Sequence, residues 1–141
     1  MSENNEDASE VTRTLIDELV DFFRYPVYTW DVTKKRAFLI LDALARWNPE
    51  VGVLYQDQLI NMCGLDIGPS TGPNTLRATR IAMTRATSIR IGAEGNGMNR
   101  IYTFNSLRTK NEVLQFMTLP KWERIRKHLA NEILEHRRRG W

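Results

Sequence analysis

Two short helices followed by a tight β-hairpin, between Tyr55 and Phe104, form the pattern that most constrains the fold of this chain. Residues 88–91 and 100–104 alternate between apolar and polar side chains and are rich in β-branched and aromatic residues, as half-buried strands are. Between them, Asn96-Gly97 favours a tight turn because both residue types tolerate positive φ. The pattern therefore predicts a two-stranded antiparallel hairpin over residues 89–104.

Two helical segments precede this hairpin. The first covers residues 55–63 and ends at Gly64, because glycine most easily adopts the left-handed backbone of a helix end. The second is predicted over residues 74–86, with Asn74 or Thr75 at its start. The connection 66–73 contains two Gly-Pro breaks and is longer than the roughly three or four residues of a typical helix-turn-helix turn.

The helix 74–86 has two chemically different sides when its residues are placed about 100° apart. The side predicted to face the core holds Leu76, Thr79, Ala82, Met83 and Ala86. The side predicted to face solvent holds Arg77, Arg80, Ile81, Thr84 and Arg85. Solvated helix faces usually mix charges of both signs, whereas this side has no acid. It is therefore predicted to meet an anion.

Three apolar segments lie before these helices. A helix is predicted from Ser9 or Glu10 to Arg24, because the residue before Pro26 avoids the helical region. A second helix is predicted from Lys34 to Trp47, with Thr33 as its cap. This second helix is apolar on most sides, which places it at the centre of the domain. Residues 51–54 predict a brief strand.

The chain ends in a helical pattern over residues 113–139 with a break at Pro120. One face of it carries Trp122, Ile125, Leu129 and Ile133, and the N-terminal helix similarly carries Val11, Leu15, Leu19 and Phe22. Both faces are more apolar than a lone surface helix requires. They either form a homodimer contact or pack on their own domain.

Charge is distributed very unevenly along the chain. The net charge is +3, but residues 71–110 hold seven basic residues and a single acid, Glu94, which gives +6. Residues 1–33 hold eight acids and two bases, which gives −6. Such asymmetry predicts that one face of the molecule meets an anion, of which phosphate is the commonest.

Composition sets broader limits. A length of 141 residues suits one domain with helical extensions, and no apolar run approaches the roughly 18 residues of a membrane span. The acidic, polar start does not resemble a signal peptide, and one cysteine permits no internal disulfide. We expect a reducing compartment: the cytoplasm, at the nucleoid, for a prokaryotic or viral protein, or the nucleus for a eukaryotic one.

The order of elements in residues 34–104 resembles the winged helix-turn-helix family of DNA-binding domains. That family has the order helix, short strand, helix, helix, strand, hairpin loop and strand. The resemblance implies a mainly α fold with a small β-hairpin (α+β), in which the hairpin 89–104 is the wing. The expected organisation is an acidic disordered tail (1–9), an N-terminal helix and connection (10–33), a winged-helix domain (34–106) and a C-terminal helical extension (107–141).

The resemblance also implies that helix 74–86 enters the major groove and that the wing contacts the backbone or minor groove. Arginine bonds guanine or phosphate through two donors, and amides at a helix start can hold a phosphate. Arg90 and Arg100 are predicted to lie close together across the hairpin, with an anion between them. Candidate DNA-binding residues are Arg77, Arg80, Thr84, Arg85, Asn74, Thr71, Arg90, Asn96, Arg100, Lys34 and Lys35.

Catalysis is not expected. His128 and His136 are about two helical turns apart and have basic neighbours, and Cys63 lies among apolar residues as a small core side chain would. The chain has no phosphate-loop lysine motif, no dinucleotide-binding glycine pattern and no zinc-ligand spacing. We therefore predict no catalytic residue, no metal site and no cofactor.

Two functions remain open at this stage. The first is sequence-specific binding of double-stranded DNA by a transcriptional regulator, which such proteins usually perform as homodimers. The second is a winged-helix adaptor that binds proteins in a transcription or replication assembly. The acidic N-terminal segment would then bind a protein partner, or cover the basic face when DNA is absent. Structured RNA is a third possible ligand.

Overall fold

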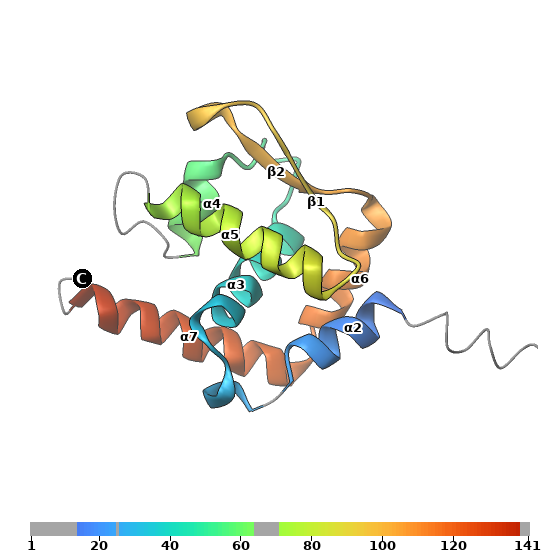
Figure 1. Ribbon diagram of the computed structural model, residues 1–141, viewed down its shortest axis with the longest axis vertical. Helices are drawn as coiled ribbons and strands as arrows, with labels where there is room; N and C mark the ends of the chain where they lie inside the picture. Colours follow the sequence, from blue (N-terminus) through green and yellow to red (C-terminus); the bar gives the residue numbers. More distant parts are fainter. Residues whose placement is uncertain (1–13, 25, 64–70, 139–141) are drawn as a thin grey trace, which may run out of the picture.

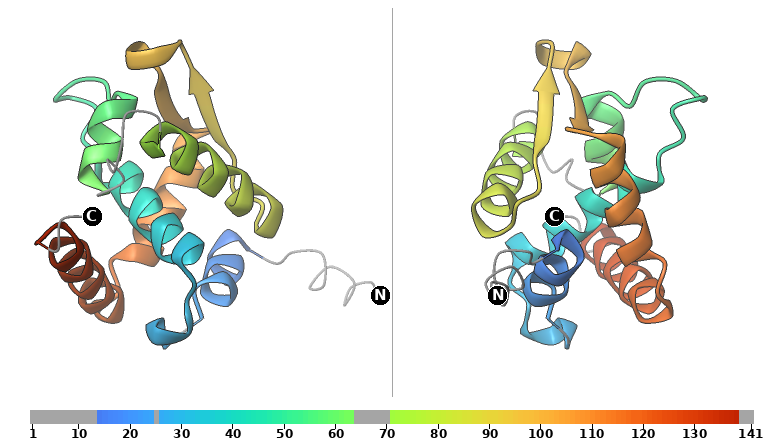
Figure 2. Two further views of the ribbon diagram at one scale, coloured as in Figure 1. Left: turned by 60° about the vertical axis from the view of Figure 1, so that its left-hand side comes forward. Right: turned by 90° about the vertical axis from the view of Figure 1, so that its right-hand side faces the viewer.

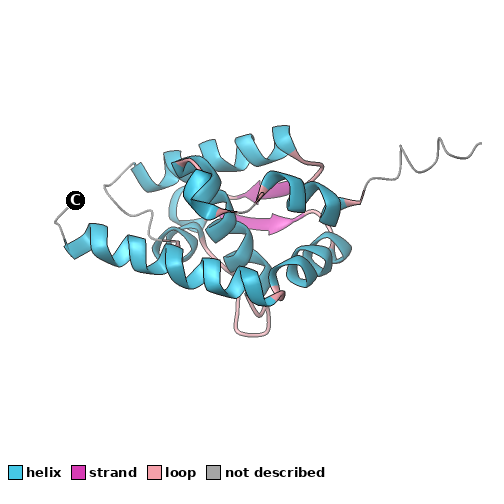
Figure 3. Cartoon of the chain, turned by 90° about the horizontal axis from the view of Figure 1, so that it is seen from below, coloured by secondary structure: helices cyan, strands magenta, loops and turns pink. Residues whose placement is uncertain are grey.

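The computed structural model describes residues 14–24, 26–63 and 71–138. They form a mainly helical structure with one small antiparallel sheet (Figures 1 and 3). In chain order the elements are α2 (Leu15–Phe22), η1 (Val27–Thr29), α3 (Val32–Arg46), α4 (Gln56–Met62), α5 (Thr71–Ala86), β1 (Ile91–Glu94), η2 (Gly97–Asn99), β2 (Ile101–Phe104), α6 (Leu107–Met117) and α7 (Pro120–Arg138).

Helix α3 lies at the centre of the structure, as its apolar sequence predicts. It contacts α4, α5, α6, α7 and β2, and Phe38 and Leu41 on it are fully buried. The hairpin projects at one end of the molecule above α4 and α5, while α7 lies at the other end (Figures 1 and 2). Fully burying a side chain such as Phe38 contributes roughly 1.5–3 kcal/mol.

The terminal helices belong to the same core as the middle of the chain. Phe23, which follows α2, packs its ring against Phe38 of α3 and Phe116 of α6, and Phe116 packs on Trp122 of α7. The described residues of α2, α6 and α7 therefore share one hydrophobic cluster with α3, α4 and α5.

The apolar faces proposed as a dimer contact are largely used within the chain. Leu19, Trp122, Ile125 and Leu129 are at most 3% exposed, and Leu15 and Phe22 are partly buried against the same core. Val11 and the side chain of Ile133 lie outside the described residues. The apolar character that suggested a homodimer is thus explained by packing in the chain's own core.

Helix starts are determined by short-range hydrogen bonds. The prediction that Thr33 caps the central helix is wrong: Asp31 is the cap, since its carboxylate accepts from the amide of Lys34 at 2.8 Å. Thr14 caps α2 in a reciprocal pair with Asp17. Ser106 caps α6 by accepting from the amide of Thr109 at 3.1 Å.

Helix ends depart from the predictions by a few residues. The described N-terminal helix begins at Leu15 and ends at Phe22, two residues before Arg24; the predicted start at residues 9–10 lies outside the described residues. Helix α6 begins at Leu107, six residues before the predicted start. The break at Pro120 is confirmed, and this proline is the first residue of α7, where its fixed φ suits a helix.

Strand register and turn conformation define the wing. Ile91 pairs with Phe104 and Glu94 with Ile101. The predicted turn at Asn96-Gly97 is only partly correct, since the glycines on either side of Asn96, at φ +86° and +56°, have positive φ, whereas Asn96 is extended at φ −130°. A Cβ on Gly95 would lie 2.6 Å from the Asn99 carbonyl oxygen, so this position requires glycine.

The brief strand predicted over residues 51–54 is absent from the described structure. In its place, Tyr55 forms an isolated antiparallel bridge with Ile101, and the amide of Gln56 donates to the Arg100 carbonyl at 2.8 Å. Helix α5 starts at Thr71, three residues before the predicted Asn74. The wing is thereby joined to the start of α4 beside α5.

Candidate nucleic-acid interface

One side of α5 is open to solvent along its length. Its exposed residues, named here the α5 stripe, are Asn74, Arg77, Ala78, Ile81 and Arg85. At about 100° per residue these five span an arc of about 100°. Leu76 and Met83, on the opposite side, are each 1% exposed and fix the orientation of the helix against α3 and α4.

The two arginines of the stripe make no polar contact with any residue that the structure describes. Within the described residues, neither Arg77 nor Arg85 has a hydrogen bond or an ion pair, and both side chains are exposed. Glu94 is the single acid between residues 71 and 110 and lies in the wing. The stripe therefore presents two unneutralised guanidinium groups to solvent.

Arg80 does not belong to this exposed side, contrary to the prediction. It is half-buried, and its Nη1 donates to the carbonyl of Ile91 at 3.1 Å. Its guanidinium carbon lies 5.8 Å from the centre of the Tyr102 ring. At about −120° from Asn74 on the helix, Arg80 faces the wing, so it joins α5 to β1 and β2.

Arg100 meets the same aromatic ring from the wing. Its guanidinium carbon also lies 5.8 Å from the ring centre of Tyr102, whose hydroxyl donates to Gln56 Oε1 at 3.0 Å. The Nε atoms of Arg80 and Arg100 are buried without an acceptor, and neither arginine has an acidic partner among the described residues. We call Arg80 and Arg100 the arginine pair.

The arginine pair places two positive charges beside one aromatic ring, and each ring contact contributes about 0.5–2 kcal/mol. In the strand predicted over residues 100–104, alternation puts Arg100 and Tyr102 on one face, and this pattern could have linked them from the sequence.

The prediction that Arg90 and Arg100 lie close together is wrong. Arg90 precedes β1 and lies opposite Asn105 at the base of the hairpin, whereas Arg100 lies near its tip. The Nη1 of Arg90 donates to the carbonyls of Thr84, Thr87 and Ile89 at 3.3, 3.2 and 2.7 Å. Arg90 therefore caps the carbonyl end of α5, where a cation is favourable.

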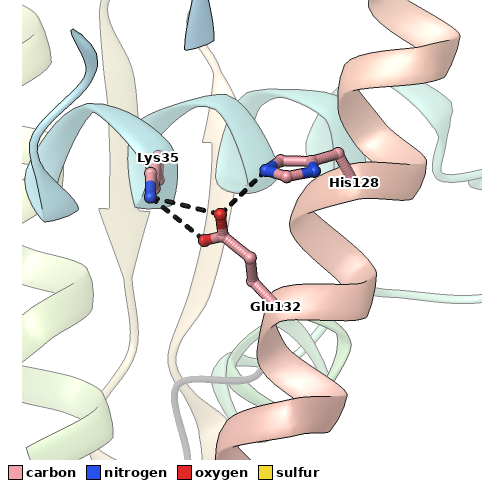
Figure 4. A network of polar contacts seen from close by, with 3 residues as sticks. All are labelled: Lys35, His128 and Glu132. Atoms are coloured by element: carbon pink, nitrogen blue, oxygen red, sulfur yellow. Dashed lines mark hydrogen bonds and ion pairs between the residues drawn. The ribbon is translucent and has the colours of Figure 1, made fainter. Parts of the chain in front are cut away.

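Lys34 and Lys35 also lie apart from the α5 stripe. The Nζ of Lys34 lies 5.2 Å from the ring centre of Phe22. The Nζ of Lys35 lies 3.0 and 3.4 Å from the two carboxylate oxygens of Glu132, and Nε2 of His128 lies 2.9 Å from Oε2 of the same carboxylate (Figure 4). Both lysines begin α3, at the end of the molecule away from the wing (Figure 1).

Among the remaining candidate residues, some have exposed side chains and one makes a hydrogen bond within its own helix. Asn74 is exposed in the first turn of α5, and Asn96 is exposed at the tip of the wing. The hydroxyl of Thr84 donates to the Ile81 carbonyl within its own helix at 2.9 Å. Thr71 is the first residue of α5, and its side chain lies outside the described residues.

Reactive side chains elsewhere are buried or paired. Cys63 is 1% exposed, and burial, aided by the nearby Asp42 carboxylate, raises the pKa of its thiol to about 12. Asp42 itself accepts from Nε of Arg126 at 2.8 Å. Over residues 14–24, 26–63 and 71–138, no three His, Cys, Asp or Glu side chains are grouped so that they could hold a metal ion.

A second surface feature lies on the other edge of the wing. A hollow of about 520 Å³ separates residues 52–54 from β2 and the start of α6. Its lining is mainly apolar and includes Trp47, Val53, Phe104 and Leu107, of which Val53 and Leu107 are exposed. The sequence did not predict this hollow, because residues 51–54 were expected to form a brief strand.

No family model, curated protein or solved structure significantly matches this chain. In the part of the chain that the structure describes, none of the helices has the length and apolar character needed to cross a membrane. The case for a function therefore depends on the α5 stripe and the arginine pair.

Proposed function

We propose that this protein is a sequence-specific double-stranded DNA-binding protein of the winged-helix type that regulates transcription. In this proposal α5 reads the major groove and the wing contacts the backbone or the minor groove. The observation that carries it is the exposed, acid-free stripe of α5 with its unpaired Arg77 and Arg85.

The dimensions of α5 suit a groove. Its 16 residues extend about 24 Å, and Arg77 and Arg85 are eight residues, or about 12 Å, apart along the axis. At about 3.4 Å per base pair this separation covers three to four base pairs. Each arginine can bond guanine through two donors, or a phosphate at the groove edge.

The arginine pair supplies the contact expected of a wing. Arg80 and Arg100 lie where α5, β2 and the start of α4 meet, joined by the hydrogen bond from Tyr102 to Gln56. A helix seated in the major groove brings this junction beside the sugar-phosphate backbone. The pair would then fix the register of α5 on the duplex rather than read bases.

The test is binding of the purified protein to a labelled random-sequence duplex. Binding is measured by fluorescence anisotropy of the duplex at salt concentrations from about 50 to 200 mM. We expect steep weakening with salt, and enrichment of a defined sequence on repeated selection. The Arg77→Ala variant should bind more weakly at every salt concentration. Arg124→Ala, which removes an exposed arginine from α7, is the matched control and should bind as the parent does.

A protein-binding adaptor is the second candidate, and the apolar hollow beside β2 favours it. An adaptor would use the hollow and leave duplex DNA unbound. Absence of duplex binding at about 50 mM salt, where electrostatic binding is strong, would reject the DNA proposal and favour this second function.

A further inference from the structure

An apolar side chain occupies the middle of the α5 stripe. Ile81 is 38% exposed, and the exposed Ala78 lies beside it one turn earlier. The stripe around them is polar: Asn74 and Arg77 precede them, and Arg85 follows. Ile81 therefore places an apolar group between Arg77 and Arg85, where the stripe would meet a ligand.

The surroundings argue for a small apolar target. Ile81 is the single large exposed apolar residue described on α5, so α5 by itself forms no broad apolar patch of the kind that binds proteins. The short side chain of Ala78 lets the helix backbone approach its ligand closely. The ligand must therefore offer one apolar group within an otherwise polar, anionic surface.

Only one group on a base edge in the major groove has this character, the C5-methyl of thymine. We propose that Ile81 determines specificity by contacting a thymine methyl group, an inference that rests on the proposed DNA-binding function. Arg77 and Arg85 each lie four residues from Ile81, about 6 Å along the helix. The preferred site then holds a thymine with guanine, or a contacted phosphate, about two base pairs to either side.

The experiment uses the full chain and two kinds of synthetic duplex. The first is the sequence that the parent protein enriches from a random pool, and the second is a series in which one of its thymines at a time is replaced by uracil. This change removes only the methyl group. Binding is measured with the parent, Ile81→Ala, and Leu119→Ala as a control that truncates an exposed apolar residue on the α6–α7 connection.

For the parent and Leu119→Ala, uracil at one position should weaken binding about three- to fivefold, the effect of one lost methyl contact. For Ile81→Ala, thymine and uracil at that position should bind equally. Equal binding of both kinds of duplex by the parent, with salt-dependent binding retained, would overturn the role of Ile81 and leave the proposed function standing. No duplex binding at about 50 mM salt would overturn both.

Because Ile81 is exposed, its truncation should leave the fold intact, which circular dichroism checks. A methyl effect that persists unchanged in Ile81→Ala would assign the contact to another residue and also refute the inference. Ile81→Val keeps a branched apolar group and should retain part of the discrimination between thymine and uracil.

Discussion

Two sets of basic side chains, one at each end of the molecule, differ in their ion pairs. Beside α7, Lys35 is paired with Glu132, and Arg126 is paired with the buried Asp42. Beside the wing, Arg77, Arg80, Arg85 and Arg100 have no acidic partner within the described residues. The two sets carry charge of the same sign and differ in pairing: Lys35 and Arg126 are held by acids of the fold, whereas the four arginines beside the wing have no such partner among the described residues.

The largest effect, on the free energy of unfolding, is expected from breaking the ion pair between Arg126 and the buried Asp42. Arg126→Met removes the partner of Asp42, whose carboxylate is 10% exposed, and leaves an uncompensated charge in the core. We expect a loss of about 3 kcal/mol in the free energy of unfolding, measured by urea denaturation. DNA affinity per folded molecule should not change. If stability falls by less than about 1 kcal/mol, the pair is not a structural element of this end.

The next effect concerns the free arginines. Arg77→Ala combined with Arg85→Ala should weaken binding to the selected duplex roughly 100-fold, since each paired contact contributes about 1–3 kcal/mol. The thermal midpoint should stay within about 2 °C of the parent, because both side chains are exposed. Equal affinity in the parent and the double variant, at matched salt, would show that the α5 stripe is only a solvated surface.

A smaller effect, on both stability and DNA binding, is expected at the junction of α5 and the wing. Arg80→Ala removes the hydrogen bond to the Ile91 carbonyl and one contact with the Tyr102 ring. We expect a loss of stability of about 1–2 kcal/mol together with weaker DNA binding. Arg100→Ala, which removes a side chain that makes no hydrogen bond among the described residues, should mainly affect binding. Equal loss of stability in both would contradict this division.

The smallest effect is predicted at the opposite end. Lys35→Ala removes a partly exposed pair, which should change the free energy of unfolding by less than about 1 kcal/mol. Binding to DNA should be unchanged, although Lys35 was among the candidate contacts. A reduction in affinity beyond about twofold would place a second DNA-binding surface at the start of α3.

Local patterns predicted much of the fold. The buried central helix, the break at Pro120 and the second strand of the hairpin follow from apolar periodicity, proline geometry and β-rich alternation. These depend on neighbouring residues, so a single sequence contains them. The position of the α5 stripe was also predictable, because helical periodicity separates Leu76 and Met83 from Arg77 and Arg85.

Partners distant in sequence were not predictable in this way. Lys35 meets an acid 97 residues later in the chain, and Arg80 meets a strand carbonyl 11 residues later. Arg90 and Arg100 are far apart because Ile91 pairs with Phe104 and Glu94 with Ile101, which puts the two arginines at opposite ends of the hairpin. Such contacts depend on how the helices and the wing pack together.

The reactivity of Cys63 can measure how often the fold opens around α4. It is the one cysteine in the chain, and its thiol is fully buried with a pKa raised to about 12. An alkylating reagent can therefore reach a reactive thiolate only when α4 separates from the core, so the labelling rate measures how often that happens. A duplex that binds only the folded form would slow labelling in proportion to its occupancy, which gives an affinity scale without any attached dye.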